Sequence, residues 1–95
     1  MFAVVRTNSV PDHLRGYLTR FLQQTGPGLY VGKLSPRVVD LLWDRLVAAA
    51  TDGGVVMVCS AANDAGFTIR LHQVAGSQLT DFDGIGLPVE NRSLT

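Results

Sequence analysis

The sequence predicts an α+β fold with a mainly antiparallel sheet and two helices. Three observations predict it: two amphipathic helical stretches, several short β-rich runs around them, and a length of 95 residues, which is too short for a doubly wound domain. This length also predicts one domain, which we place at residues 1–90, and a frayed tail at 91–95. Because a domain of this size buries only about 60 to 65% of its unfolded surface, an oligomer would add useful burial.

The first part of the chain predicts a strand, a helix and a second strand. Residues 2–7 form a β-rich run that starts the fold. Pro11 then suits the first turn of a helix, and the apolar residues after it share one helical face over residues 11–24. The glycine-rich run at 26–28 ends this helix, and residues 29–32 read as a brief strand between glycines.

The second part predicts a longer helix and a hairpin. Ser35-Pro36 is a typical cap followed by a first-turn proline, and apolar residues line one broad face from there to about Thr51. Residues 55–59 are continuously apolar, as in a strand buried on both faces. A hairpin loop at 63–66 leads into residues 67–72, where apolar and polar residues alternate as in a half-buried antiparallel strand.

The final segment predicts one short strand at the edge of the sheet. Ile85, Leu87 and Val89 alternate with glycine and proline, and proline is tolerated at sheet edges. Such a strand is able to pair with a partner chain. The complete pattern predicts a ferredoxin-like fold with both helices on one face of the sheet. The opposite face then needs a cover, which predicts a homodimer.

Charge and cysteine content narrow the function. Eight basic residues balance eight acidic ones, which argues against tight DNA binding by the chain alone and favours DNA contacts shared with a partner. Cys59 is the single cysteine, so an intramolecular disulfide is excluded. The sequence lacks a signal-peptide pattern and an apolar run of about 18 residues. We therefore expect a cytoplasmic protein that does not bind membranes.

Several motifs occur in an order that resembles one known family. They are VPDHLRG at 10–16, GLYVG at 28–32, Trp43, GVVM at 54–57, Gly66-Phe67 and Asp83-Gly84. This order resembles the second family of CRISPR-associated proteins, subtype I-E, over nearly the whole chain to Val89. The resemblance implies a ferredoxin-like dimer that joins through its sheet and sits between two dimers of the CRISPR integrase. It implies an adaptor that binds double-stranded DNA together with this integrase, on which the C-terminal segment docks.

Four basic side chains are candidates for nucleic-acid binding. Arg15, with His13 and Arg6, is placed to present donors to phosphates near the start of the first helix, where the resemblance puts DNA contacts. Arg37 matches a basic position that the family uses near the DNA path. The alternatives are a solvated arginine at position 15, a surface histidine at 13, and an ion pair between Arg37 and Asp40.

The resemblance also raises a metal-dependent nuclease, because the wider family carries an acidic residue at the end of the first strand. Asn8 stands at that position, and a neutral amide lacks the charge that Mg²⁺ requires from its few protein ligands. We therefore predict no catalytic residue, no cofactor and no metal site. The alternatives are an endonuclease acting on RNA or DNA, with Mg²⁺ held by Ser9, Asp12 or the pair Asp81 and Asp83, and a regulatory dimer that binds a small effector.

Two further carboxylates share one face of the second helix. Asp40 and Asp44 lie four residues apart, as an acid–base pair would require. They have no histidine or third acid nearby in the sequence. We interpret them as solvated charges that Arg37 and Arg45 balance.

Overall fold

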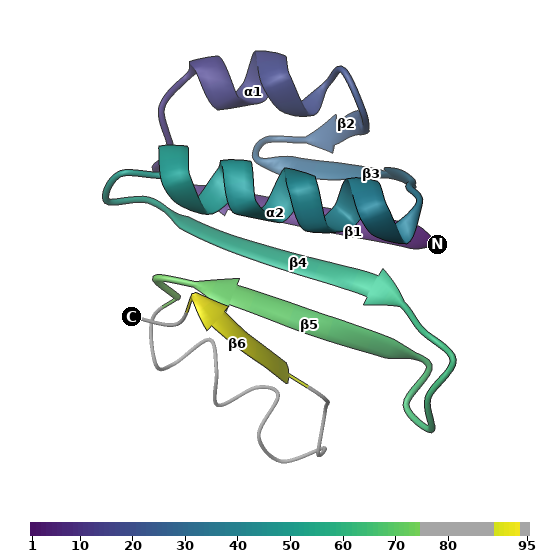
Figure 1. Ribbon diagram of the computed structural model, residues 1–95. Coiled ribbons are helices and arrows are strands. Elements are labelled where there is room, and N and C mark those ends of the chain that lie inside the picture. Colours follow the sequence, from purple (N-terminus) through teal and green to yellow (C-terminus); the bar gives the residue numbers. More distant parts are fainter. Residues whose placement is uncertain (75–88, 94–95) are drawn as a thin grey trace.

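A computed structural model describes residues 1–74 and 89–93, which form one six-stranded sheet with two helices packed on it (Figure 1). The strand order across the sheet is β2-β3-β1-β4-β5-β6. In chain order the elements are β1 (Phe2–Asn8), α1 (His13–Leu18), β2 (Gln23–Gly26), β3 (Leu29–Lys33), α2 (Pro36–Ala49), β4 (Gly54–Ser60), β5 (Phe67–His72) and β6 (Val89–Ser93).

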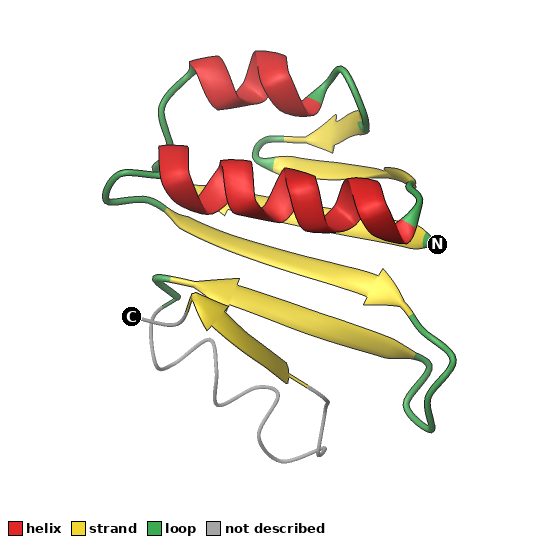
Figure 2. Cartoon of the chain, in the orientation of Figure 1, coloured by secondary structure: helices red, strands yellow, loops and turns green. Residues whose placement is uncertain are grey.

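The order of elements confirms the predicted α+β, ferredoxin-like fold. Elements β1 to β4, with α1 and α2 between them, give the sheet order β4-β1-β3-β2, and every pairing among these strands is antiparallel. Strand β5 continues the sheet antiparallel to β4, and β6 lies parallel to β5 at the outer edge. Both helices cover the same face of the sheet (Figure 2). Within the described residues, neither helix is long and apolar enough to cross a membrane.

The core lies between the helices and one face of β1, β3 and β4. Strand residues at alternate positions point into it, among them Val5 and Met57, which are paired across β1 and β4 and are fully buried. Trp43 of α2 and Leu18 of α1 are also fully buried and close the core from above. Burial of these apolar side chains is the main force that holds the helices on the sheet.

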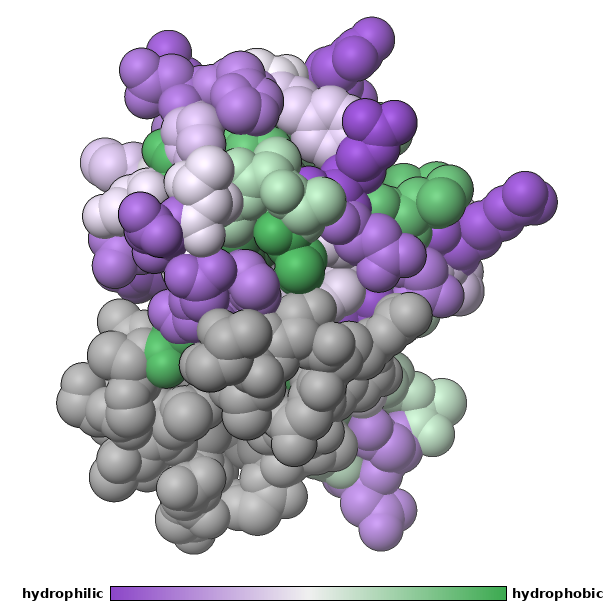
Figure 3. All heavy atoms as spheres, turned by 60° about the vertical axis from the view of Figure 1, so that its left-hand side comes forward, coloured by the Kyte–Doolittle hydropathy of each residue, from purple (hydrophilic) through white to green (hydrophobic). Residues whose placement is uncertain are grey.

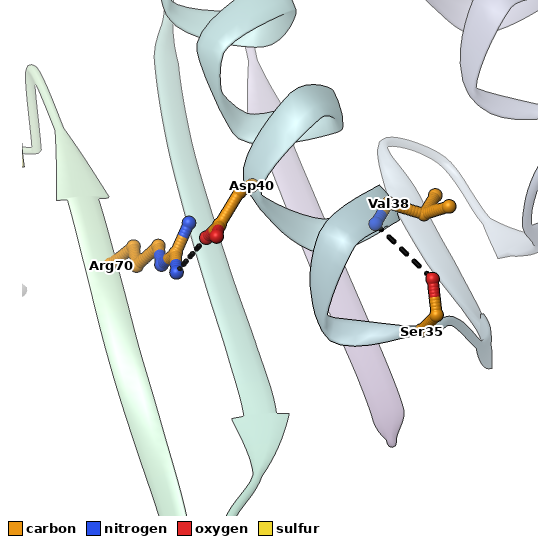
Figure 4. A network of polar contacts seen from close by, with 4 residues as sticks. All are labelled: Ser35, Val38, Asp40 and Arg70. Atoms are coloured by element: carbon orange, nitrogen blue, oxygen red, sulfur yellow. Dashed lines mark hydrogen bonds and ion pairs between the residues drawn. The ribbon is translucent and has the colours of Figure 1, made fainter.

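Helix α2 agrees with its predicted range. The Ser35 hydroxyl accepts a hydrogen bond of 3.2 Å from the Val38 amide (Figure 4). Pro36 occupies the first turn. The charged side chains of its polar side do not form the predicted pairs of Asp40 and Asp44 with Arg37 and Arg45. Asp40 forms an ion pair of 2.6 Å with Arg70 instead of Arg37. The Arg45 guanidinium lies 5.9 Å from the centre of the Tyr17 ring on α1.

The predicted helix over 11–24 is wrong in length, and strand β2 was not predicted. Helix α1 ends at Leu18, where the turns tighten through bonds such as Phe21 N to Leu18 O at 3.0 Å. Leu22 is still buried, because it packs over Gly32 of β3, where a Cβ atom would lie 2.9 Å from its Cδ2. Leu22 therefore continues the apolar stripe of the helix without being helical. The mostly exposed edge strand β2 has no alternating pattern that would reveal it.

Strand β5 differs from the predicted half-buried strand. The cross-strand pairs Met57↔Arg70 and Val55↔His72 place both polar side chains on the face that carries the helices. Arg70 and His72 are only 8% and 6% exposed. Ile69, on the opposite face, is fully buried as well. Both faces of β5 are thus buried. The polar residues of the alternating pattern lie on one buried face and the apolar residues on the other.

The C-terminal edge strand exists but lies further along the chain than predicted. Strand β6 begins at Val89 and pairs with Ile69, whereas Ile85 and Leu87 lie outside the described residues. Residues 91–93 belong to β6. Asp81 and Asp83 also lie outside the described residues.

The sheet face opposite the helices presents apolar side chains on β1, β3 and β4. Strand alternation and the pairs Val4↔Val31 and Val4↔Val58 place these valines together on that face, next to Val56 and Phe2. The four valines are half-buried and Phe2 is 49% exposed. The predicted burial of residues 55–59 on both faces is therefore only partial in the single chain. We call these five residues the open face.

Candidate nucleic-acid interface

A hollow of about 550 Å³ opens at the end of the molecule where β1 stops and α1 begins. Figure 3, which brings this end of the molecule forward, shows hydrophilic residues gathered around a smaller apolar area. We call this feature the β1 hollow. Its lining comes from the end of β1, the connection to α1, the first turn of α1 and the β2–β3 hairpin: Arg6, Thr7, Asn8, Ser9, Val10, Pro11, Asp12, Arg15, Gln24, Pro27, Gly28 and Tyr30.

Close backbone packing fixes the walls of the β1 hollow. The Thr7 amide donates a 2.7 Å hydrogen bond to the Gly28 carbonyl, which ties the β2–β3 turn to the end of β1. Ser9 has a φ of 58°, an uncommon value for a residue with a side chain, and it redirects the chain from β1 toward α1. Gly53 passes directly beneath, because a Cβ atom there would lie 2.6 Å from the Ser9 carbonyl oxygen. The strained turn is therefore held by its neighbours.

Gly28→Ala is expected to destabilise the wall of the β1 hollow. Gly28 has a φ of 66°, and an added Cβ would lie 2.6 Å from the Thr7 carbonyl oxygen. We expect the free energy of unfolding to fall by about 2 kcal/mol, measured by urea denaturation. Gly16→Ala is the matched control, because nothing lies within 4 Å of the added Cβ in α1. That change should stabilise by about 0.5–1 kcal/mol, and equal losses for both variants would contradict the assigned role of Gly28.

Two unpaired arginines give the β1 hollow its charge. Arg6 and Arg15 both line it and are exposed, and neither guanidinium has a hydrogen bond or ion pair with the part of the chain that the structure describes. Asp12 is the one carboxylate in the lining, and it lies beyond 4.0 Å from any described cation. The hollow thus combines two free positive charges with one negative charge, which suits an anionic ligand.

The other two predicted basic residues lie elsewhere. His13 lines a smaller cleft of about 120 Å³ between the helices, together with Tyr17 and Arg45. Arg37 is exposed in the first turn of α2, near the start of β1, where the Leu34 amide bonds the Met1 carbonyl at 2.8 Å. The β1 hollow lies at the other end of that strand, because Thr7, Asn8 and Ser9 line it. The structure therefore brings Arg6 and Arg15 together and separates them from Arg37.

A model of one protein family matches most of the chain. The family is described as CRISPR-associated protein (Cas_Cas2CT1978), and the match covers residues 2–87. The chain belongs to this Cas2 family of CRISPR-associated proteins. It therefore has a role in CRISPR adaptation, which is the general function that the predicted resemblance implied.

The residues of this Cas2 chain do not fit a divalent metal ion at the end of β1. Asn8 offers a neutral amide there, and its Oδ1 lies 3.5 Å from the Ser9 hydroxyl. Asp12 is the only acid in the lining, while Arg6 and Arg15 would repel a cation. Among residues 1–74 and 89–93, no three histidine, cysteine or acidic side chains gather as metal ligands would. Within one chain, Ser9 and Asp12, the alternative ligands considered from sequence, supply a single negative charge to this hollow.

Sequence reasoning missed the contributions of β2 and β3 to the hollow. Gln24 and Tyr30 line it, and Tyr30 is only 2% exposed. The Tyr30 hydroxyl has no hydrogen-bond partner within the described residues. The glycine-rich segment Gly26-Pro27-Gly28 was the available signal, because such a segment predicts a tight turn that approaches another backbone closely. Which backbone it approaches depends on the pairing of β1 with β3, which the pattern alone does not give.

Proposed function

We propose that this Cas2-family chain is a homodimeric, non-catalytic adaptor and DNA-binding subunit of the complex that integrates foreign DNA during CRISPR adaptation. The observation that carries the proposal is the β1 hollow, which combines two unpaired arginines with a single carboxylate, whereas a metal-dependent nuclease requires a cluster of acidic groups. The ordered motifs of the sequence resemble subtype I-E, and we propose a complex of that subtype that works in the cytoplasm. The nuclease alternative has no supporting ligand set in the described part of the chain.

The open face supports a homodimer. Its half-buried valines extend over three adjacent strands, and Phe2 adds a large exposed side chain at one end. The β1, β3 and β4 pairing places no acidic residue on this side of the sheet, and Arg6 and Lys33 are the charged residues that flank the open face. An apolar surface of this kind is well suited to pair with its own copy around a two-fold axis. A second copy would cover the sheet face that the two helices leave free.

Strand β6 supports docking of the CRISPR integrase at the other end of the sheet. It is the last strand in the sheet order, so one side of its backbone has no neighbour among the described strands. Backbone groups on such an edge bind an additional strand readily. We propose that Val89, with Ile85 and Leu87 before it, belongs to the segment that the integrase binds.

The proposal predicts that DNA affinity depends on the integrase. With four candidate basic residues and no excess of positive charge, the protein alone should bind duplex DNA weakly, and its complex with the integrase should bind much more tightly. Fluorescence anisotropy with a labelled forked duplex, at one fixed salt concentration, measures both affinities. Equal affinity in the two states would contradict the adaptor role. DNA cleavage by the protein alone that requires Mg²⁺ would favour the nuclease.

A further inference from the structure

We infer that the edge of β5 recognises the C-terminal strand β6 by charge, through an ion pair between Arg70 of β5 and Glu90 of β6. Glu90 and Asp40 of α2 then share one buried guanidinium. The recognition itself depends only on the described fold, whereas its consequence for the integrase rests on the proposed function.

Arg70 places a positive charge inside the protein. Its side chain is 10% exposed, and it lies on the sheet face that carries the helices, paired with the fully buried Met57 of β4. A buried cation costs free energy unless carboxylates and hydrogen bonds compensate for the water that it loses. Asp40 supplies one carboxylate oxygen, 2.6 Å from Nη2 of the guanidinium (Figure 4). Because the Asp40 side chain is 54% exposed, water screens part of this attraction.

The register of β6 brings a second acid to the same place. Val89 pairs with Ile69, and Glu90 pairs with Arg70. Residues paired across neighbouring strands share one face of a sheet, at a separation over which opposite charges attract. A guanidinium carries five N–H donors in a planar fork, so carboxylates can bind it from two directions. The structure therefore pairs the buried arginine with the one acidic residue of β6.

Backbone pairing alone holds β6 weakly. The strand has five residues, and its pairing with β5 is the one parallel pairing in the part of the sheet that the structure describes. Parallel pairing is slightly less stable per residue than antiparallel pairing. The register also shifts between Arg70 and His72, directly after the charged pair. An ion pair at Arg70 therefore adds attraction where the ladder of backbone hydrogen bonds is least regular.

The same ion pair selects which strand binds to β5. An open strand edge accepts many extended segments, because their backbone groups are alike in every sequence. A segment with an uncharged residue opposite Arg70 would cover the guanidinium and gain no such attraction. A shift of β6 by one residue places Val89 or Asn91 opposite Arg70 and turns Glu90 to the other face. The pair thus fixes both the identity and the register of the bound strand.

Hydrogen–deuterium exchange of the β6 amides tests the inference on the intact protein. Glu90→Gln keeps the shape of the side chain and removes its charge, so the amides of residues 89–93 should exchange about tenfold faster. Exchange in β1 should change little, because β1 is not a neighbour of β6 in the sheet. Glu90→Asp retains the carboxylate and should keep most of the protection.

Arg92→Gln is the matched control for Glu90→Gln. It removes a charge from the same strand, at a position that does not pair with Arg70, so β6 should stay protected. If Glu90→Gln leaves the exchange of β6 unchanged, or if Arg92→Gln accelerates it equally, the inference is wrong.

A double-mutant cycle tests whether Glu90 and Asp40 share the guanidinium. In the Asp40→Asn protein the guanidinium depends more strongly on Glu90, so Glu90→Gln should accelerate β6 exchange by clearly more than tenfold. Asp44→Asn is the control background, because Asp44 has no ion pair within the described residues, and there the factor should stay at about ten. The same factor in both backgrounds would contradict the sharing. Arg70 itself stays unchanged, since replacing this buried residue would also disturb the core.

Binding to the integrase separates this inference from the proposed function. The segment that we propose the integrase binds ends at Val89, so the ion pair at Glu90 anchors that segment to the sheet. Glu90→Gln should therefore weaken integrase binding several-fold, measured by biolayer interferometry, and Glu90→Asp should not. Protection of β6 that depends on Glu90, without any binding of the integrase, would keep the ion pair and remove the adaptor role. Integrase binding with β6 exchange that is insensitive to Glu90 would keep the adaptor role and remove the ion pair.

Discussion

Val58→Glu is expected to disrupt the homodimer that we propose and to leave the protein monomeric. Val58 lies on β4 at one side of the open face, paired with Val4 of β1 and with Ile69 of β5. A glutamate there would be buried in an apolar interface without a described cation opposite it in either neighbouring strand. We expect the dimer dissociation constant to rise by at least about a hundredfold, which corresponds to roughly 3 kcal/mol. Sedimentation velocity over a range of concentrations measures this change.

Ala48→Glu is the matched control for this substitution. Ala48 is exposed on α2, on the side of the sheet away from the open face, so the variant adds the same charge and leaves the proposed interface intact. We expect Ala48→Glu to remain dimeric. A circular dichroism melt should show that both variants are folded. If folded Val58→Glu dimerises as tightly as Ala48→Glu, the open face is not the dimer interface.

Asp40→Asn is expected to lower stability by removing the charge that faces a buried arginine. The Arg70 side chain is only 10% exposed, and its Nη2 lies 2.6 Å from Asp40 Oδ1, where it reaches over β4 to α2 (Figure 4). Asparagine keeps the shape but loses the charge, and hydrogen bonds to charged groups contribute roughly 1.5–3 kcal/mol. Because the Asp40 side chain is 54% exposed, we expect the lower part of that range, about 2 kcal/mol. The Tm should fall by about 8–16 °C.

Asp44→Asn provides the comparison on the same helix. Asp44 is exposed one turn after Asp40, and it has no ion pair within the described residues. Its replacement removes the same charge without breaking a contact, so the Tm should change little. Both variants are melted at one protein concentration, because unfolding of the dimer that we propose would depend on concentration. Equal effects of the two substitutions would show that Arg70 does not depend on Asp40.

The success of the sequence analysis differs between the two helices for a physical reason. Helix α2 was predicted closely because Ser35 caps it, proline follows, and its stripe of apolar residues ends with the helix. Helix α1 was predicted too long because Leu22 lies on the same stripe as Leu14 and Leu18 but belongs to the connection that packs on Gly32. A helical wheel records where apolar residues face, not whether the backbone stays helical.

Strand β5 shows a second limit of local patterns. Alternation with Arg70 and His72 predicted a face open to solvent, because polar residues usually occupy such faces. The structure covers that face, since Asp40 of α2 reaches Arg70 from a distance of 30 positions in the sequence. An ion pair between distant elements satisfies a polar residue inside the protein. No local pattern reveals that pairing.

The candidate site was predicted in part. Arg6, Asn8 and Arg15 were identified from the sequence, and all three line the β1 hollow. The separation of Arg37 from them follows from the antiparallel pairing of β1 with β3, which places the start of α2 at the opposite end of β1. The share of the β2–β3 turn in the hollow also depends on this pairing. The chemical type of each site residue could be predicted from the sequence. Which of these residues lie close together could be known only from the order of the strands in the sheet.

An integration assay tests the central claim most directly. The CRISPR integrase, a short forked duplex and a plasmid carrying the repeat are incubated with Mg²⁺, with this protein, with its Asn8→Ala variant, or with neither. If the protein is a non-catalytic adaptor, the integrase should insert the duplex efficiently in the presence of either the unchanged protein or its Asn8→Ala variant, because the integrase performs the chemistry. Little insertion is expected when the integrase is incubated with neither. Loss of insertion with a folded, dimeric Asn8→Ala variant would contradict the claim, as would equal insertion by the integrase alone.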